Sequence, residues 1–191
     1  MLAVIEYMKI LAFAGSNSVQ SINRKLVIHT LTYFQNIEIN LLDLNDYEMP
    51  LFSVDRQLKD GFPQKAYNFL AQIESCDAII LSLAEHNRSY TVAFKNIFDW
   101  CSRIDINIFK SKPMFIMSTS PGGFGGGNVM AAAMAFFPKC GAEIIESFSL
   151  PLFNQNFKDK IGITNEELKD QYETKISNFK NNLENQKLLI T

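Results

Sequence analysis

Hydrophobic residues alternate between two patterns along this chain. Short, mostly apolar runs, as expected for buried strands, predict five strands at residues 9–14, 38–42, 78–83, 114–117 and from 141 to about 145. Between these runs, apolar stripes with a helical period predict helices at residues 21–34, 62–75, 91–101 and 128–137, and a last one after residue 164. Strands that alternate with helices in this way predict an α/β fold, with one parallel, doubly wound sheet and helices on both faces.

The whole chain, residues 1–191, is expected to form a single domain. Residues 1–7 are expected to be an N-terminal extension, and residues 185–191 a frayed tail. At the start of the last helix, Thr164 and Glu167 have the spacing of a capping box. The apolar stripe that follows predicts packing of this helix along the sheet, through Leu168, Tyr172, Ile176, Phe179 and Leu183.

Composition narrows the class of protein. A net charge of −2 gives no electrostatic footprint for nucleic acid or an anionic membrane, and no apolar run is long enough for a membrane span. The two histidines and three scattered cysteines lack the spacing of a metal site, so no metal is expected. No signal peptide is recognisable, and free cysteines favour a reducing, cytoplasmic setting.

The loop after the first strand predicts a phosphate site. Residues 15–23 carry three serines and two asparagines at the start of a helix, where backbone N–H groups and the helix field favour an anion. Capping of the helix by Ser21 alone is the simpler alternative, but one serine would suffice for that. The loop matches neither a Walker A sequence nor a dinucleotide fingerprint, so a monophosphate fits it better.

The loops after the third and fourth strands are also polar. Residues 84–91 bring His86, Asn87 and Ser89 to the same rim of the sheet, although a polar loop at this place is weak evidence by itself. Residues 118–127 combine three hydroxyl side chains with five of the nine glycines of the chain. Glycine allows the backbone to approach a flat ligand closely, so this loop favours a ligand site over a plain surface connection.

Together the three loops resemble those of the NAD(P)H-dependent FMN reductase family, a flavodoxin-like branch that includes quinone, azo and chromate reductases. The first loop matches the family's Gly-Ser-x-x-x-x-Ser-x-Asn pattern at Gly15, Ser16, Ser21 and Asn23. The second resembles Pro-Glu-Tyr-Asn-x-Ser followed by Leu-Lys-Asn-x-x-Asp-Trp, at Glu85, Asn87, Ser89, Lys95, Asn96, Asp99 and Trp100. The third, residues 118–123, resembles the loop along the polar edge of the flavin ring. The resemblance covers residues 8–183.

The departures from the family pattern fall mainly beside the ring. Ser18 stands where many members have an arginine, so the phosphate loop is less basic than usual. Ala84 and Thr91 replace prolines, His86 replaces a tyrosine and Arg88 replaces a common glycine. The resemblance therefore determines phosphate binding more closely than it determines the ring contacts or the substrate.

The resemblance implies a fold, a cofactor and a reaction. It implies a flavodoxin-like three-layer sandwich with strand order 2-1-3-4-5, and FMN held by Ser16, Ser18, Ser21, Ile22, Asn23, Glu85, His86, Asn87, Ser89, Ser118, Thr119, Ser120, Gly122 and Gly123. Hydride would pass from NADPH or NADH to flavin N5 and then to a small-molecule acceptor such as a quinone, free flavin or azo compound, in a ping-pong cycle without a catalytic acid or base from the protein. A flavodoxin-like electron carrier or redox sensor is the alternative.

The resemblance and the aromatic content also favour self-association. The chain has 16 phenylalanines, 6 tyrosines and a single tryptophan, Trp100. In the family, the helix that ends in Asp-Trp lies at a dimer interface beside the flavin, so a homodimer or homotetramer is expected. The simpler interpretation of Trp100 is an ordinary core residue.

Overall fold

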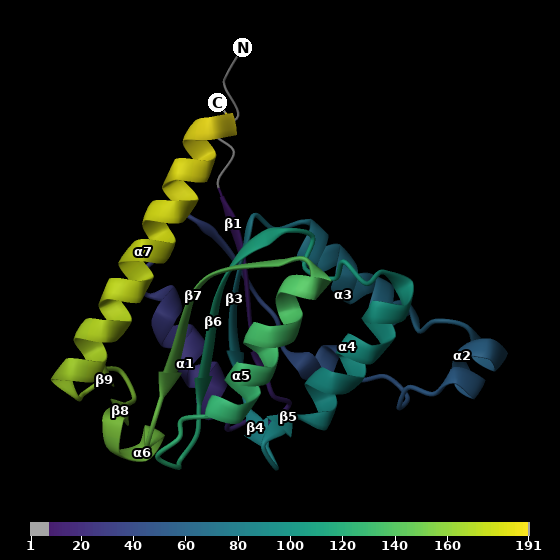
Figure 1. Ribbon diagram of the computed structural model, residues 1–191, viewed down its shortest axis with the longest axis horizontal. Helices are drawn as coiled ribbons and strands as arrows, with labels where there is room; N and C mark the ends of the chain where they lie inside the picture. The colour runs from purple at the N-terminus through teal and green to yellow at the C-terminus, as the bar shows by residue number, and fades with distance from the viewer. Residues whose placement is uncertain (1–7, 191) are drawn as a thin grey trace.

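The centre of the molecule is a five-stranded parallel sheet (Figure 1). The structure is a computed structural model and describes residues 8–190, with the side chains of residues 187–190 excepted. Across the sheet the strands run in the order β2 (Glu38–Leu41), β1 (Lys9–Gly15), β3 (Ala78–Leu83), β6 (Lys112–Thr119) and β7 (Ala142–Leu150). Counted along the chain, these are strands 2-1-3-4-5, so the flavodoxin-like strand order is confirmed.

Helices cover both faces of the sheet, as the apolar runs predict. In Figure 1, α1 (Ile22–Leu31) and α7 (Glu166–Ile190) lie on the left of the sheet, and α3 (Gln64–Glu74), α4 (Val92–Ile104) and α5 (Gly127–Phe136) lie on its right. Alternate residues of β1 enter the two cores: Ile10 packs on the side of α1 and α7, whereas Leu11 packs on the side of α3 and α4. The strand order reverses between β1 and β3, because β2 lies on one side of β1 and β3 on the other, and ligands bind at such a point in sheets of this kind.

Several short elements lie outside the predicted pattern. α2 (Val54–Asp60) and a 3₁₀ turn (Leu44–Tyr47) precede α3, and a second 3₁₀ turn (Phe137–Cys140) follows α5. A hairpin of β4 (Glu85–His86) and β5 (Ser89–Tyr90) precedes α4. After β7 come α6 (Phe153–Asn156) and a hairpin of β8 (Phe157–Lys158) and β9 (Gly162–Ile163). These elements are too short for a periodic pattern to reveal them.

The start of α7 differs from the prediction. Asn165, and not Thr164, caps the helix: its side-chain oxygen accepts the Leu168 N–H at 3.0 Å. The Thr164 hydroxyl instead donates to the Gln155 carbonyl at 3.4 Å, because the chain arriving from β9 turns this side chain toward α6. The predicted capping box is therefore wrong by one residue. α7 continues to Ile190, through most of the segment where fraying was expected, and the expected extension of residues 1–7 lies outside the described residues.

The cysteines and the tryptophan belong to the core. Cys76, Cys101 and Cys140 are free and buried, and burial raises the pKa of the Cys76 thiol to about 11 and that of Cys101 to about 12. Trp100 is fully buried, with Phe52 packed edge-on against its ring at 5.1 Å between centroids. Within the described residues no group of histidine, cysteine and acidic side chains could hold a metal ion, and no helix could span a membrane.

Candidate functional site

Three loops leave the sheet side by side at its carboxyl edge, toward the bottom of Figure 1. Gly15 of β1 is paired with Leu83 of β3, and Leu83 is paired with Ser118 of β6. The loops 16–21, 84–91 and 120–126 therefore start from neighbouring points of the same edge. The structure thus brings together the three segments that the sequence marks as polar or glycine-rich.

The loop after β1 prepares the start of α1 for an anion. Ser21 is the N-cap, and its hydroxyl accepts the Arg24 N–H at 3.2 Å, as the capping alternative expects. Ser16 and Ser18 stabilise the loop, since their hydroxyls accept the N–H groups of Ser18 and Gln20 at 3.2 and 3.3 Å. At the first two helical positions, Ile22 and Asn23, the backbone N–H groups have no acceptor within the helix. These N–H groups remain for a ligand.

The Asn23 side chain has a structural role that the sequence does not reveal. It is buried, and its amide oxygen accepts the Ser82 hydroxyl at 2.7 Å and the Thr119 N–H at 3.1 Å. Its amide nitrogen donates to the Thr119 carbonyl at 3.2 Å. Asn23 thus fixes the start of α1 against the ends of β3 and β6, and only its backbone N–H is placed for a phosphate.

The hydroxyls before the glycine loop differ in availability. Ser118 is buried, and its hydroxyl donates to the Gly125 carbonyl at 2.8 Å. Thr119 is buried too, and donates to the Leu150 carbonyl at 2.8 Å. Ser120 is half-buried and lies nearer the surface. The side chains of Ser118 and Thr119 therefore hold the loop in shape, and Ser120 is the hydroxyl of this group that a ligand could reach.

The five glycines of this loop divide into two sets. Gly125 and Gly126 have φ of +61° and +80°, so the fold itself requires glycine at these two positions, whereas a Cβ at Gly127 would meet only the exposed ring of Phe124. Gly122 and Gly123 are outside the left-handed region. A Cβ at Gly123 would meet nothing within 4 Å, and one at Gly122 only the Ser120 hydroxyl at 3.8 Å. The protein's own packing does not explain these two glycines.

The β4–β5 hairpin forms the next wall. Asn87 and Arg88 make its two-residue turn with φ of 51° and 64°, as a type I′ turn requires. His86, Asn87 and Ser89 are exposed at this rim. The hairpin is joined to the first loop through Thr91, whose hydroxyl caps α4 by accepting the Phe94 N–H at 3.2 Å and donates to the Gly15 carbonyl at 2.8 Å.

Glu85 points toward α5 and not toward the loop after β1. Its carboxylate accepts the Asn128 side-chain N–H at 3.0 Å and the Val129 backbone N–H at 2.9 Å. α5 has Gly126 as its N-cap, with no side-chain cap of its own, so Glu85 caps the helix from another loop. Despite partial burial, these hydrogen bonds hold the pKa of Glu85 below its usual value. The structure thus places Glu85 between two walls of the site.

A cleft of about 340 Å³ lies between the hairpin, the loop after β1 and the chain that follows β2. Its lining includes Asn17, Asn45, Tyr47, Glu48, Leu51 and His86. Partial burial raises the pKa of Tyr47, so its hydroxyl stays protonated at neutral pH. The sequence indicated no role for the stretch 44–51. The signal that could have found it is its place after β2, beside the point where the strand order reverses.

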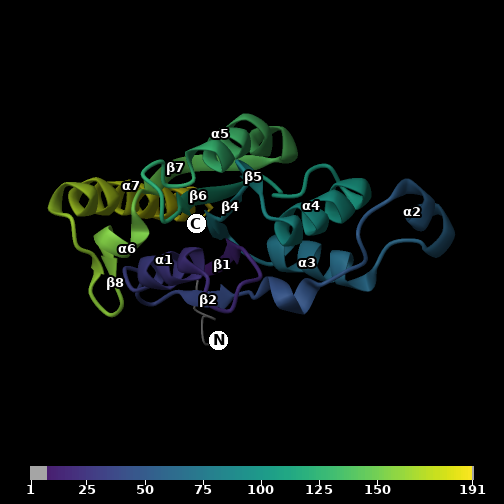
Figure 2. The ribbon, with the colours of Figure 1, turned by 90° about the horizontal axis from the view of Figure 1, so that it is seen from below.

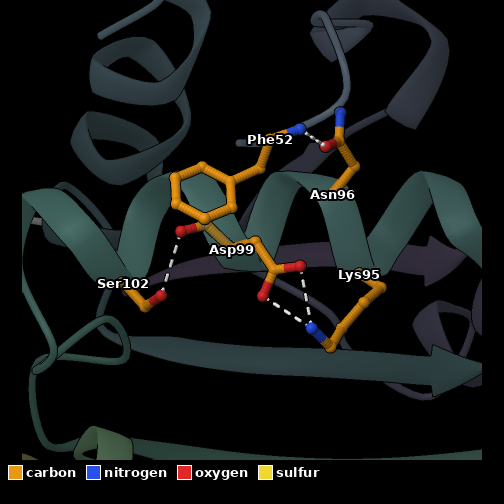
Figure 3. A network of polar contacts seen from close by, with 5 residues as sticks. All are labelled: Phe52, Lys95, Asn96, Asp99 and Ser102. Carbon is orange, nitrogen blue, oxygen red and sulfur yellow. Dashed lines mark hydrogen bonds and ion pairs between the residues drawn. The ribbon is translucent and has the colours of Figure 1, made fainter. Parts of the chain in front are cut away.

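In α4, the motif Lys-Asn-x-x-Asp-Trp holds the chain at residues 49–52 beside this cleft. Figure 3 shows Lys95, Asn96 and Asp99 of this motif. The Asn96 side chain accepts the Phe52 N–H at 2.8 Å and donates to the Met49 and Pro50 carbonyls at 3.0 and 3.2 Å. The Trp100 ring N–H also donates to the Pro50 carbonyl, at 2.7 Å. Lys95 and Asp99 form an ion pair at 2.6 Å on the outer side of α4. Asn96 and Trp100 therefore position the cleft wall.

Comparison with family models identifies the family to which this chain belongs. Residues 8–156 match the model of the NADPH-dependent FMN reductases, and they include all three loops. The chain belongs to that family. Membership implies FMN as cofactor.

Individual relatives are similar in sequence to parts of this chain. A quinone reductase of Escherichia coli is 32% identical over 91 residues, 48% of each chain. An NAD(P)H-dependent FMN reductase of Pseudomonas aeruginosa is 31% identical over 118 residues, 61% of this chain and 62% of the relative. The matches thus span about half to two thirds of the length of these curated relatives.

Solved structures show the same fold over almost the whole chain. The flavoenzyme NAD(P)H:(acceptor) oxidoreductase FerB of Paracoccus denitrificans superposes with a TM-score of 0.73 at 24% identity, covering 93% of this chain and 98% of that one. An azoreductase of Bacillus anthracis gives a TM-score of 0.61 at 16% identity, covering 93% and 97%. At identities of 24% and 16%, these two similarities show a shared fold.

Proposed function

We propose that this protein is an NAD(P)H-dependent oxidoreductase that binds FMN at the carboxyl edge of the sheet. The phosphate would be held by the N–H groups of Ile22 and Asn23 and by the hydroxyls of Ser16 and Ser18. The loop that contains Gly122 and Gly123 would lie along the polar edge of the ring, and His86, Asn87 and Ser89 would lie on its other side. Ser21, Glu85, Ser118 and Thr119 would support these contacts by holding the loops in place.

The observation that carries this proposal is the open pair Gly122 and Gly123. Neither has a backbone conformation that requires glycine, and the positions of their missing Cβ atoms lie in free or nearly free space. A flat ligand that touches this backbone would need that space. The adjoining N-terminus of α1 is suited to a phosphate, so the residues present fit FMN on two independent grounds.

These residues indicate which part of the chemistry the cofactor would supply and which part the protein would supply. When bound, FMN supplies the redox chemistry, since its ring accepts a hydride from a reduced nicotinamide and returns electrons to an acceptor. The chain contributes backbone N–H groups along the Ser120–Gly123 stretch, which would favour negative charge on the ring edge. The cleft beside His86 and Tyr47 would receive the acceptor, for which a quinone, free flavin or azo compound is proposed. We assign no side chain as an acid or base.

The matched variants Gly123→Val and Ala132→Val test the cofactor site. Valine at Gly123 would occupy the proposed ligand space, where an added Cβ meets no protein atom within 4 Å, whereas Ala132 lies on the exposed side of α5. FMN titrations followed by flavin fluorescence should show binding to the natural protein and to Ala132→Val, and at least tenfold weaker binding to Gly123→Val. Equal affinity of all three proteins would refute the site.

Turnover distinguishes the enzyme from the electron-carrier alternative. The natural protein with FMN should oxidise NADPH or NADH at a rate that rises when a quinone is added. Tight FMN binding without nicotinamide oxidation would favour the carrier or redox sensor and contradict the proposed enzyme. Comparing the two nicotinamides in this assay also gives the preference between them.

We further propose a cytoplasmic homodimer or homotetramer. The three free, buried thiols support a reducing compartment. Support for self-association from Trp100 is weaker than the sequence suggests, because its side chain is fully buried in the core of a single chain. Large exposed apolar side chains support self-association instead, including Leu51, Val54 and Leu58. Light scattering that gives the mass of one chain would contradict the oligomer.

A further inference from the structure

The segment around α2 extends away from the rest of the molecule (Figures 1 and 2). We call residues 51–61 the arm. The arm contains α2 (Val54–Asp60), and none of the seven residues of this helix is buried. Isolated helices of this length are unstable in water, because helices in proteins depend mainly on packing of an apolar face. The face of α2 has no such packing within the described chain.

The face that lacks a neighbour is apolar. Val54 and Leu58 are one helical turn apart and are 60% and 78% exposed. Leu51, just before the helix, is 62% exposed, and Tyr67 of α3 is 44% exposed. Tyr67 packs against Phe62 at the base of the arm, at 6.2 Å between ring centroids, so the apolar surface continues from the arm onto α3.

The base of the arm is fixed. Phe52 and Phe62, on either side of α2, both pack edge-on against the buried ring of Trp100, at 5.1 and 6.3 Å between centroids. Asn96 accepts the Phe52 N–H (Figure 3). The Ser53 hydroxyl caps α2 by accepting the Arg56 N–H at 3.1 Å. The arm is therefore held in place on both sides of α2, while the apolar face of this helix stays uncovered. This combination is typical of a preformed contact surface.

The charges of α2 favour a second copy of this chain as the partner. Asp55 and Lys59 are exposed and have opposite signs, and neither takes part in an ion pair within the described part of the chain. In an antiparallel pair of identical helices about a two-fold axis, each Asp55 faces the Lys59 of the other copy, and the Val54 and Leu58 side chains meet between them. The helix is thus complementary to itself in charge and in apolar pattern.

We propose that the arm pairs with the arm of a second copy of this chain, through antiparallel contact of the two α2 helices. This inference rests on the proposed homo-oligomer and assigns its contact surface. An interface of standard size takes roughly 20–30 residues a side, so the arm supplies part of it and the adjoining surface around Tyr67 supplies more. Leu51 also lines the cleft, so the contact would lie beside the proposed acceptor site.

The first test is the mass of Leu58→Lys in light scattering over a range of protein concentrations. Because Leu58 is 78% exposed, lysine should leave the fold of one chain intact. We expect this variant to have half the mass of the natural protein. The control is Ile161→Lys, at a side chain that is 67% exposed on the β8–β9 hairpin, far from α2 in both views, and its mass should be unchanged.

Charge reversal tests the antiparallel arrangement itself. Asp55→Lys and Lys59→Asp should each dissociate more readily than the natural protein, by at least tenfold in the dissociation constant. Mixed in equal amounts, they should restore the natural mass, because each chain then meets opposite charges at both contacts. Failure of the mixture to associate better than either variant alone would overturn the antiparallel pairing.

Other outcomes overturn the proposal as a whole. A natural protein with the mass of one chain at all concentrations tested would do so, and so would Leu58→Lys with unchanged mass. If Leu58→Lys changes FMN or quinone affinity but not mass, the arm is a cover for the cleft and not a contact between copies. FMN binding is measured on the same samples, so loss of the flavin assignment and loss of the pairing are recognised separately.

Discussion

Glu85 should couple two walls of the proposed flavin site, because it joins the β4–β5 hairpin to the start of α5. Its carboxylate accepts hydrogen bonds from Asn128 and Val129 at 3.0 and 2.9 Å, and so caps α5 from the hairpin. Charge-assisted hydrogen bonds contribute about 1.5–3 kcal/mol, but Glu85 is only partly buried. We therefore expect Glu85→Ala to lower the free energy of unfolding by about 2 kcal/mol, as for loss of a helix cap.

The assay is thermal and urea unfolding of Glu85→Ala, with Glu74→Ala as control. For a chain of this size, a loss of 2 kcal/mol lowers Tm by roughly 4–8 °C. Glu74 is an exposed carboxylate on α3, so its removal should change Tm by much less. Glu85→Gln should lie between the two, since an amide can still accept one hydrogen bond but loses the charge that favours a helix N-terminus. Equal Tm values for Glu85→Ala and the natural protein would refute the capping role.

The same carboxylate predicts a pH dependence with a defined sign. The pKa of Glu85 is lowered in the folded protein, so its stabilising contribution is fully present above the ordinary carboxyl pKa of about 4.3. The contribution is lost as the pH falls through the lower, folded value. The difference in stability between the natural protein and Glu85→Gln should therefore be constant from pH 6 to 7 and shrink below about pH 4. A difference that grows on acidification would contradict this assignment.

Three further substitutions test particular contacts by urea unfolding. Gly126→Ala should destabilise by about 1–3 kcal/mol, because Gly126 has φ of +80° and a Cβ there would lie 3.0 Å from that of Ser118; an unchanged midpoint would contradict this geometry. Arg88→Gly should stabilise by about 1 kcal/mol, because Arg88 has φ of 64° in the hairpin turn; a loss would mean that its side chain matters more than its backbone. Tyr172→Phe should cost about 1–2 kcal/mol by removing the buried hydrogen bond to Thr30 at 2.6 Å; no change would show that the hydroxyl is dispensable.

The sequence by itself determined the architecture and indicated where a candidate site lies. Apolar runs buried on both faces, separated by amphipathic stripes, allow few arrangements other than a doubly wound sheet. In such a sheet the loops at the carboxyl ends of the strands meet, so three loops rich in serine, asparagine and glycine indicate one candidate site. The family membership, which the same loops suggested, is confirmed.

Only the tertiary structure decided which contacts each candidate site residue makes. Asn23 contacts Thr119 across 96 positions of sequence, and Glu85 contacts Val129 across 44. Such partners depend on how distant segments meet, and local periodicity carries no record of them. The glycine loop shows this most clearly: Gly125 and Gly126 serve the fold, whereas the space beside Gly122 and Gly123 is open. Identical residues thus differ in role because their neighbours in space differ.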